Sequence, residues 1–169
     1  NNMISLLNIV EIALKYNSKL IFSSSSTVYG NPKKFPITEE MPLEKPSSPY
    51  GQTKKMGEEI LIDVSKEKNL SVASLRYFNP IGSHESSLIG EKLSKNPIHI
   101  MPYITQVAIG IKKKLTIFGN DYNTKDGTCV RDFIHVNDVA EAHIKSISFL
   151  NKNKNKYHKF NIGLGKGVS

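Results

Sequence analysis

Two spacings of hydrophobic residues recur along this chain and predict alternating helices and strands. In residues 3–15 the apolar side chains Leu6, Val10 and Leu14 follow the period of an amphipathic helix, whereas residues 19–23 form a short apolar run typical of a buried strand. Read in this way, the whole chain has helices at residues 3–15, 50–66, 102–113 and 137–150, and strands at residues 19–23, 71–77, 115–118, 130–135 and 159–162. Strands that alternate with helices predict an α/β fold with a Rossmann-like, doubly wound parallel sheet.

Local signals mark where these elements begin and end. Five prolines make residues 32–49 a loop, because proline lacks the amide hydrogen that helices and strands use. Pro102 suits the first turn of the helix that it opens, and Asn137 is the expected N-cap of the helix that follows it. Residues 151–159, rich in lysine and asparagine, predict a flexible, charged linker. His135 is expected to be a packed structural histidine.

Tyr50 and Lys54 stand four residues apart in an expected helix and therefore lie on one face of it. Free tyrosine has a pKa near about 10 and is a poor base at neutral pH, but a fixed positive charge beside it favours the phenolate. Tyr-x-x-x-Lys also occurs by chance in helices. The serine-rich residues 23–27 favour a catalytic interpretation, because they follow a strand at the sheet edge where open α/β folds bind ligands. Ser25, Tyr50 and Lys54 are thus a candidate acid/base unit for hydride chemistry on a sugar.

Composition narrows the classes of partner. The chain has 169 residues, 38% of them hydrophobic, which is enough for one domain with a sizeable core. Its net charge of +8 could indicate nucleic-acid binding at residues 112–114 or 151–159, but the lysines are spread among asparagines as on a solvated surface, so we expect no nucleic-acid partner. No apolar run is long enough to span a bilayer and no His/Cys spacing suggests a metal site, so we expect no membrane partner and no bound metal. The single Cys129 excludes an internal disulfide and suits a cytoplasmic setting.

Arginine is rare in this lysine-rich chain. Only Arg76 and Arg131 occur among 23 basic residues, and an arginine in such a chain suggests a need for its planar, bidentate fork, which suits phosphate. The alternative for Arg131 is a structural ion pair with Asp126 or Asp132.

Six segments carry motifs whose combination is very specific. They are Phe22–Gly30 (FSSSSTVYG), Ser48–Lys54 (SPYGQTK), Leu75–Gly82 (LRYFNPIG), Met101–Gly110 (MPYITQVAIG), Ile117–Tyr122 (IFGNDY) and Asp126–Val136 (DGTCVRDFIHV). In order and spacing they resemble the UDP-glucose 4-epimerases, a family of extended short-chain dehydrogenase/reductases, along nearly the whole chain. The resemblance implies NAD-dependent interconversion of UDP-galactose and UDP-glucose, in galactose metabolism, through transient oxidation at sugar C4.

The resemblance also implies roles for individual residues. The catalytic residues of the family match Ser25, Tyr50 and Lys54. Positions that line NAD match Asn1, Ser23, Tyr50, Lys54 and Phe78. Positions around the UDP-sugar match Ser25, Thr27, Tyr50, Asn79, His99, Leu115, Thr116, Ile117, Phe118 and Arg131. The full-length enzyme is expected to be a homodimer that pairs the helices at residues 3–15 and 50–66.

The chain resembles an internal fragment of such an enzyme. The family's NAD-binding domain opens with a strand, a Gly-rich turn and a helix, whereas the Gly-rich run here, residues 163–167, has no helix behind it and reads as a turn after a late strand. Residues 1–80 then correspond to the C-terminal half of the NAD-binding Rossmann domain, with the Tyr-x-x-x-Lys pair. Residues 81–128 contribute part of a smaller substrate-binding domain, and residues 129–169 return to the core.

Alternative functions remain within and beyond this family. Sugar-nucleotide 4,6-dehydratases share the Tyr-x-x-x-Lys unit but carry an acidic pair where this chain has Ser25, Ser26 and Thr27, which favours epimerisation. The substrate could instead be a UDP-N-acetylhexosamine or a UDP-pentose. A different possibility is an inactive fragment that only self-associates.

Overall fold

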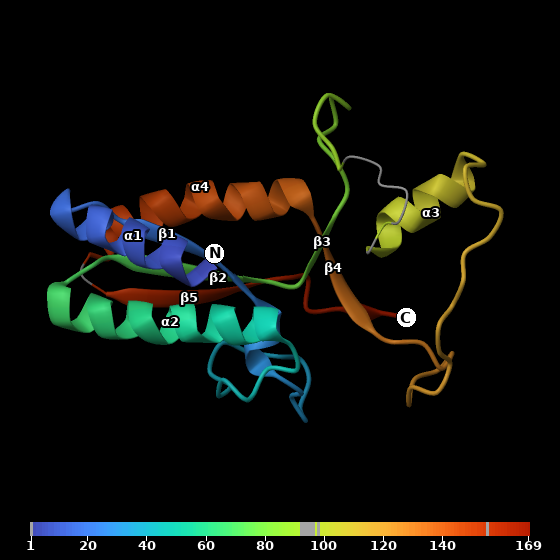
Figure 1. Cartoon of the computed structure of the whole chain (residues 1–169), viewed down its shortest axis with the longest axis horizontal. Coiled ribbons are helices and arrows are strands. Elements are labelled where there is room, and N and C mark those ends of the chain that lie inside the picture. Colours follow the sequence, from blue (N-terminus) through green and yellow to red (C-terminus); the bar gives the residue numbers. More distant parts are fainter. Residues whose placement is uncertain (1, 92–96, 98, 155) are drawn as a thin grey trace.

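The computed structural model describes residues 2–91, 97, 99–154 and 156–169, which form a mixed α/β fold (Figure 1). In chain order the elements are α1 (Asn2–Lys15), β1 (Leu20–Ser25), the 3-10 helix η1 (Ser26–Tyr29), α2 (Pro49–Lys68), β2 (Val72–Tyr77), β3 (Asn79–Ile81), α3 (Ile100–Ala108), β4 (Arg131–His135), α4 (Val136–Lys152), β5 (Tyr157–Ile162) and β6 (Gly167–Val168).

The main sheet has three parallel strands in the order β1-β2-β5. Its register pairs Ser25 with Tyr77 and Tyr77 with Ile162, so the carboxyl ends of all three strands meet at one edge. Parallel strands need crossover helices, which here lie on both faces of the sheet. The α/β, Rossmann-like parallel sheet expected from the sequence is confirmed.

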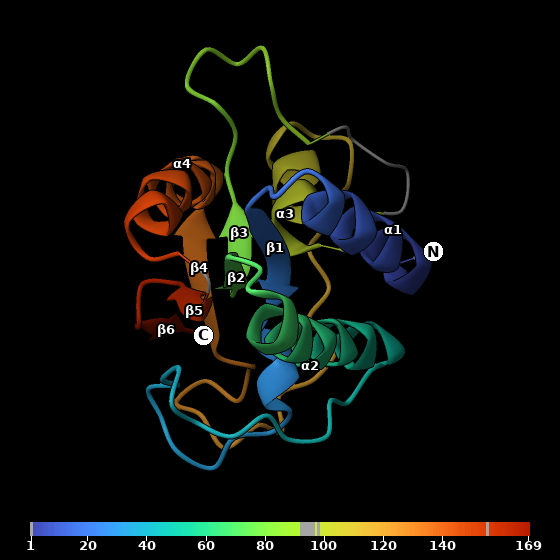
Figure 2. The same ribbon diagram turned by 90° about the vertical axis from the view of Figure 1, so that its left-hand side faces the viewer.

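Helices cover the main sheet from both sides. In Figures 1 and 2, α4 lies over one face, and α2 with α1 beside it lies over the other. The apolar core on the α1/α2 side contains Leu6, Val10, Ala13, Leu61, Leu70 and Val72. Gly57 allows α2 to pack closely against β1, since a Cβ at this position would lie 2.8 Å from the Phe22 ring. The helix that carries Tyr50 and Lys54 is therefore packed tightly on β1.

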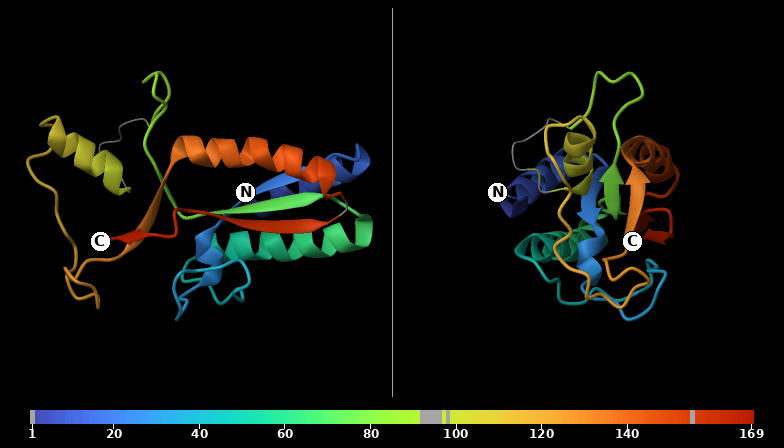
Figure 3. Two further views of the ribbon diagram at one scale, coloured as in Figure 1. Left: turned by 180° about the vertical axis from the view of Figure 1, so that it is seen from behind. Right: turned by 90° about the vertical axis from the view of Figure 1, so that its right-hand side faces the viewer.

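A smaller sheet continues beyond the carboxyl edge of the main one. In it β3 runs parallel to β4, and β4 runs antiparallel to β6 (Figure 3). Asp132 on β4 accepts hydrogen bonds from the amides of Leu164, at 2.9 Å, and Gly165, at 2.8 Å. The glycine-rich run is thus a turn after the strand β5, as expected, and Asp132 holds it against the small sheet.

Two expectations for residues 102–118 are wrong. Helix α3 ends at Ala108 rather than near residue 113, because Gly110 takes a φ of 79° that closes the helix. Residues 115–118 form no strand, and their side chains are exposed, Phe118 by 91%. An apolar run becomes a strand only where another strand satisfies its backbone, and no strand among the described residues pairs with residues 115–118.

Three further corrections concern α4 and its flanks. The N-cap is His135, not Asn137, and its Nδ1 accepts a hydrogen bond of 3.1 Å from the Asn137 amide. His135 is exposed rather than packed. The expected linker at residues 151–159 is mostly regular structure, since α4 continues to Lys152 and β5 begins at Tyr157.

Candidate active site

Ser25 ends β1 at the carboxyl edge of the main sheet. Its backbone is extended, with φ −152° and ψ 147°, and it serves as the N-cap of η1. The buried Ser25 Oγ accepts hydrogen bonds from the Thr27 amide, at 3.3 Å, and from Thr27 Oγ1, at 3.0 Å. The structure therefore joins two of the residues that the sequence assigned to the substrate.

Tyr50 and Lys54 lie in the first turns of α2. Ser48 caps this helix by accepting a 3.1 Å hydrogen bond from the Gly51 amide, and Pro49 takes the first helical position. Lys54 reaches back to β1, where its Nζ donates to the main-chain oxygen of Ser23 over 2.7 Å. The same Nζ lies 5.5 Å from the centre of the Tyr50 ring. Helix α2 thus delivers a phenol and an ammonium to the end of β1.

The electrostatics of the pair suit acid/base work. Burial lowers the pKa of Lys54 from its ordinary value, because the charged form loses water that one hydrogen bond does not replace. The Tyr50 side chain is 50% exposed and can reach a ligand at the sheet edge. A phenol and an ammonium at one edge of a sheet are groups that can act as acid and base.

The residues expected to line a cofactor lie along the same edge. The Ser23 and Tyr77 hydroxyls share a hydrogen bond of 2.8 Å. The Phe78 amide donates to the Ile162 oxygen over 3.1 Å, which fixes Phe78 where β2 meets β5. Asn1 lies outside the described residues. Hydroxyls and an ammonium at the carboxyl edge of a parallel sheet fit the ribose and nicotinamide of a dinucleotide.

Asn79 and Arg131 come together on the smaller sheet. Asn79 Nδ2 donates to the Asp132 main-chain oxygen over 2.9 Å, and Arg131 precedes Asp132 on the same strand. Arg131 is exposed, and its NH1 donates to the Val130 oxygen over 2.9 Å. Within the described residues it forms no ion pair with Asp126 or Asp132. Its fork is open to a ligand.

The remaining expected substrate residues lie farther along the chain. His99 is exposed at the start of α3 and makes no side-chain cap there. Leu115, Thr116, Ile117 and Phe118 are exposed on the long segment between α3 and β4, away from the main sheet (Figures 1 and 3). In the part of the chain that the structure describes, no hydrogen bond joins these five residues to Ser25, Tyr50 or Lys54.

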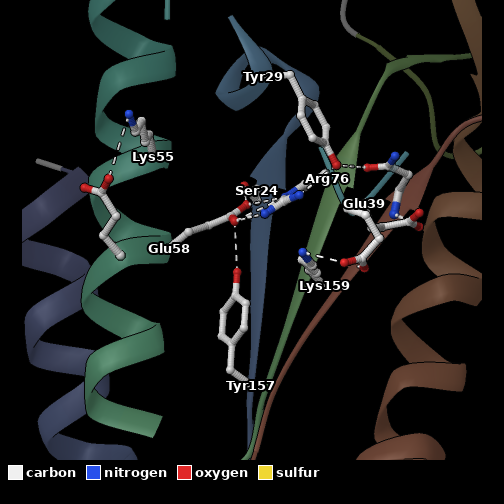
Figure 4. Close-up of polar contacts among 11 residues, drawn as sticks. Ser24, Tyr29, Glu39, Lys55, Glu58, Arg76, Tyr157 and Lys159 are labelled. Atoms are coloured by element: carbon white, nitrogen blue, oxygen red, sulfur yellow. Dashed lines mark hydrogen bonds and ion pairs between the residues drawn. The ribbon is translucent and has the colours of Figure 1, made fainter. Parts of the chain in front are cut away.

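A buried ion pair behind the site was missed from the sequence. Arg76 uses its planar fork on Glu58 rather than on phosphate, and both side chains are almost fully buried (Figure 4). Burial opposes the Arg76 charge, but the hydrogen bonds and charge of Glu58 outweigh this and raise the pKa of the guanidinium. The signal was available, because Glu58 lies one helical turn after Lys54, with Leu61 and Ser65 on the same inward stripe of α2.

Among the described residues, no three His, Cys, Asp or Glu side chains are grouped as metal ligands. None of the helices in those ranges is long and apolar enough to cross a bilayer.

The fold and the site define the class of this protein. Residues 1–163 match the NAD dependent epimerase/dehydratase family, and the chain belongs to that family. The chain is 48% identical over 171 aligned residues to a UDP-glucose 4-epimerase from Dictyostelium discoideum, with 100% of this chain and 49% of the relative covered.

Solved structures agree with this assignment. The chain superimposes on a UDP-glucose 4-epimerase from Bifidobacterium longum, crystallised with NAD+ and UDP, with a TM-score of 0.91, 44% identity and coverage of 100% of this chain and 50% of the other. For an enzyme from Stenotrophomonas maltophila, with bound NAD and formylated UDP-arabinopyranose, the TM-score is 0.93 at 42% identity, over 99% of this chain and 50% of the other. The chain thus spans about half the length of the relatives that it matches.

Proposed function

We propose that this chain is part of a UDP-glucose 4-epimerase, which interconverts UDP-galactose and UDP-glucose with NAD as its cofactor. One observation carries the proposal: Lys54 Nζ is held 2.7 Å from the Ser23 oxygen at the end of β1, with the Tyr50 ring 5.5 Å away. An acid/base tyrosine with an adjacent ammonium is the chemistry that oxidation of a sugar hydroxyl requires. The relatives named UDP-glucose 4-epimerase support the choice of substrate.

The protein's own residues account for the proton. Tyr50 takes it from the 4-hydroxyl of the sugar and later returns it, while the Lys54 charge stabilises the phenolate. Ser25 shares the proton or relays it to Tyr50. NAD, held by Ser23, Tyr50, Lys54 and Phe78, would supply the acceptor for the hydride from sugar C4 and the donor of that hydride to the other face of the same carbon.

The same proposal assigns the binding residues. Ser23, Tyr50, Lys54 and Phe78, with Asn1, hold the cofactor. Ser25, Thr27, Tyr50 and Asn79 contact the sugar. Arg131 binds the diphosphate, supported by its exposed guanidinium, which forms no ion pair within the described residues and donates to the Val130 main-chain oxygen. His99 and residues 115–118 complete the UDP-sugar site from the smaller domain, whose elements are residues 81–128.

We also propose a homodimer built on α1 and α2. The outer face of α1 exposes the large apolar residues Ile4 (66%), Leu7 (50%), Ile12 (56%) and Tyr16 (67%), and Met56 of α2 is 41% exposed. Exposure of several large apolar side chains favours burial against another surface. The single cysteine, Cys129, suits the reducing cytoplasm, which we propose as the location, and galactose metabolism as the pathway.

Conversion of UDP-galactose to UDP-glucose tests the proposal. The protein is produced at its natural full length and supplied with NAD, and the parent is compared with Tyr50→Phe. We expect turnover in the parent and a loss of about 10²- to 10⁴-fold in the variant, the usual contribution of a general base. Equal turnover in both proteins contradicts the role of Tyr50.

The same assay separates the alternatives. Turnover of a UDP-N-acetylhexosamine or a UDP-pentose but not of UDP-galactose keeps the epimerase chemistry and changes the sugar. Self-association with no NAD binding and no turnover supports an inactive, purely structural role.

A further inference from the structure

A chain of hydrogen bonds crosses the main sheet beside the candidate acid/base pair. It starts on α4, where His143 Nδ1 lies 2.8 Å from the Val139 main-chain oxygen. His143 Nε2 lies 2.7 Å from the Tyr77 hydroxyl at the end of β2, and that hydroxyl lies 2.8 Å from Ser23 Oγ on β1. A continuous chain of hydrogen bonds thus connects β1, β2 and α4, which are far apart in the sequence.

The protons of this chain can be arranged in two ways. A carbonyl only accepts, so His143 Nδ1 carries a proton and donates to the Val139 oxygen. With a neutral ring, Nε2 accepts from Tyr77, and the Ser23 hydroxyl donates to Tyr77. With a charged ring, Nε2 donates to Tyr77, and Tyr77 donates to Ser23. In both arrangements Ser23 stays tied to Tyr77, so the link between the strands does not depend on one protonation state.

Ser23 is also the residue to which the catalytic Lys54 donates a hydrogen bond. Its main-chain oxygen accepts the Lys54 hydrogen bond of 2.7 Å, while its side chain holds the Tyr77 hydroxyl. Tyr77 and Lys54 therefore fix the same residue from two directions, Tyr77 from the neighbouring strand and Lys54 from α2. The position of Lys54 beside Tyr50 depends on how firmly the end of β1 is held.

Tyr77 itself is poorly suited to act as a base. Burial raises the pKa of its hydroxyl, the Ser23 hydrogen bond lowers it, and the charge of nearby Tyr50 raises it again, with a net rise. The ionisable groups that face it are thus His143 on α4 and Tyr50 on α2. A hydroxyl that stays neutral beside a tyrosine that must ionise serves to hold its neighbours.

We propose that Tyr77 and His143 are positioning residues of the acid/base site: their hydrogen-bonded chain fixes Ser23 and thereby sets Lys54 against Tyr50. The inference rests on the proposed epimerase function for its effect on turnover. Its geometric part, the control of Lys54 through Ser23, is testable without any activity.

Tyr77→Phe tests the proposal in the full-length protein, because it removes only the hydroxyl. Tyr29→Phe is the matched control, since Tyr29, which is fully buried where Tyr77 is half-buried, also has a hydroxyl with two partners, Arg76 NH1 at 2.7 Å and Asn161 Oδ1 at 2.7 Å, neither of them Ser23. The first readout is the titration of Lys54, followed by NMR of lysine labelled with ¹³C at the ε position and assigned with Lys54→Met. We expect the pKa of Lys54 to rise toward the ordinary lysine value in Tyr77→Phe and to stay unchanged in Tyr29→Phe.

The second readout is the pH profile of kcat with UDP-galactose. We expect Tyr77→Phe to lower kcat by about 10- to 100-fold, as for a misplaced catalytic group, with KM unchanged and the acid limb moved to higher pH. His143→Gln, whose amide can still meet the Tyr77 hydroxyl, should retain more turnover than His143→Leu.

The two proposals fail in different ways. A parent protein without turnover contradicts the epimerase function, and the Lys54 titration still decides the positioning role. A Lys54 titration that is the same in Tyr77→Phe as in the parent, or a change of equal size in Tyr29→Phe, overturns that role whatever the activity.

Discussion

Glu58 on α2 and Arg76 on β2 form a bidentate ion pair inside the protein. Arg76 Nε donates to both carboxylate oxygens, at 2.9 and 3.1 Å, and the side chains are 0% and 2% exposed. Ser24 and Tyr157 donate to the same carboxylate, so β1, β2 and β5 all meet α2 at this point (Figure 4). The pair fixes the helix that carries Tyr50 and Lys54 against β2, and the Ser24 hydrogen bond ties β1, the strand that carries Ser25, to the same carboxylate.

Removing one partner of this pair should destabilise the fold. Glu58→Gln leaves the Arg76 charge buried without a carboxylate, and we expect a loss of about 3–5 kcal/mol in the free energy of unfolding. The measurement is urea denaturation of the full-length protein. The double variant Glu58→Leu/Arg76→Met removes both charges and should recover most of the loss. A single variant as stable as the parent contradicts the importance of the pair.

Alkaline pH should unfold the protein through its buried tyrosines. Burial and then the charge of Glu58 raise the pKa of Tyr157, and burial also raises the pKa of Tyr29 and Tyr77. The folded state therefore keeps these protons where the unfolded chain releases them, near about pH 10. Stability is present below that pH and falls above it, by up to about 1.4 kcal/mol per pH unit for each tyrosine.

Urea denaturation between pH 8 and pH 11 measures this fall. In Tyr157→Phe the free energy of unfolding should decline less steeply than in the parent above about pH 10. The reason is that the variant lacks one of the buried tyrosines that lose their proton when the chain unfolds. Parallel declines in the two proteins would refute the assignment.

Lys54→Met should separate activity from stability. Burial depresses the pKa of Lys54, so the unfolded chain holds this proton more tightly, and the charge opposes folding below the unfolded pKa of about 10.4. A neutral side chain of similar volume removes that cost. We expect the free energy of unfolding at pH 7 to stay equal or to rise, while turnover of UDP-galactose falls by at least about 10²-fold. A variant that unfolds much more easily than the parent would mean that Lys54 is chiefly structural.

Arg131→Ala should weaken substrate binding first. In the described part of the chain the exposed guanidinium hydrogen-bonds to the Val130 oxygen and forms no ion pair, so its loss should change stability by less than about 0.5 kcal/mol. Loss of a charge-assisted contact to diphosphate should cost about 2 kcal/mol, a KM about 30-fold higher. Arg131→Lys is the control, because it keeps the positive charge but lacks the bidentate fork. Its KM should lie between that of the parent and that of Arg131→Ala. An unchanged KM in Arg131→Ala counts against the diphosphate role.

Elements with a strong local pattern were predictable from the sequence. The helix at α2 has an N-cap serine and a proline at its first position, and the strand at β2 is buried from Val72 to Arg76. Where the local signal was apolar but no partner followed, as at residues 115–118, the prediction of a strand was wrong. His135 was missed as the N-cap of α4 because no local sequence signal marks it. Its capping role depends on the direction of its side chain at the end of β4.

The sequence by itself determined the alternation of helices and strands, the family, and the spacing that puts Tyr50 and Lys54 on one helical face. These follow from short-range rules, since residues four apart in a helix are neighbours whatever surrounds them. Only the tertiary structure decided that Lys54 bonds to Ser23, that Arg76 pairs with Glu58 rather than with a phosphate, and that the Tyr77 hydroxyl links His143 to Ser23. Such contacts join residues far apart in the chain, and they form only when strand order and helix packing bring the parts together.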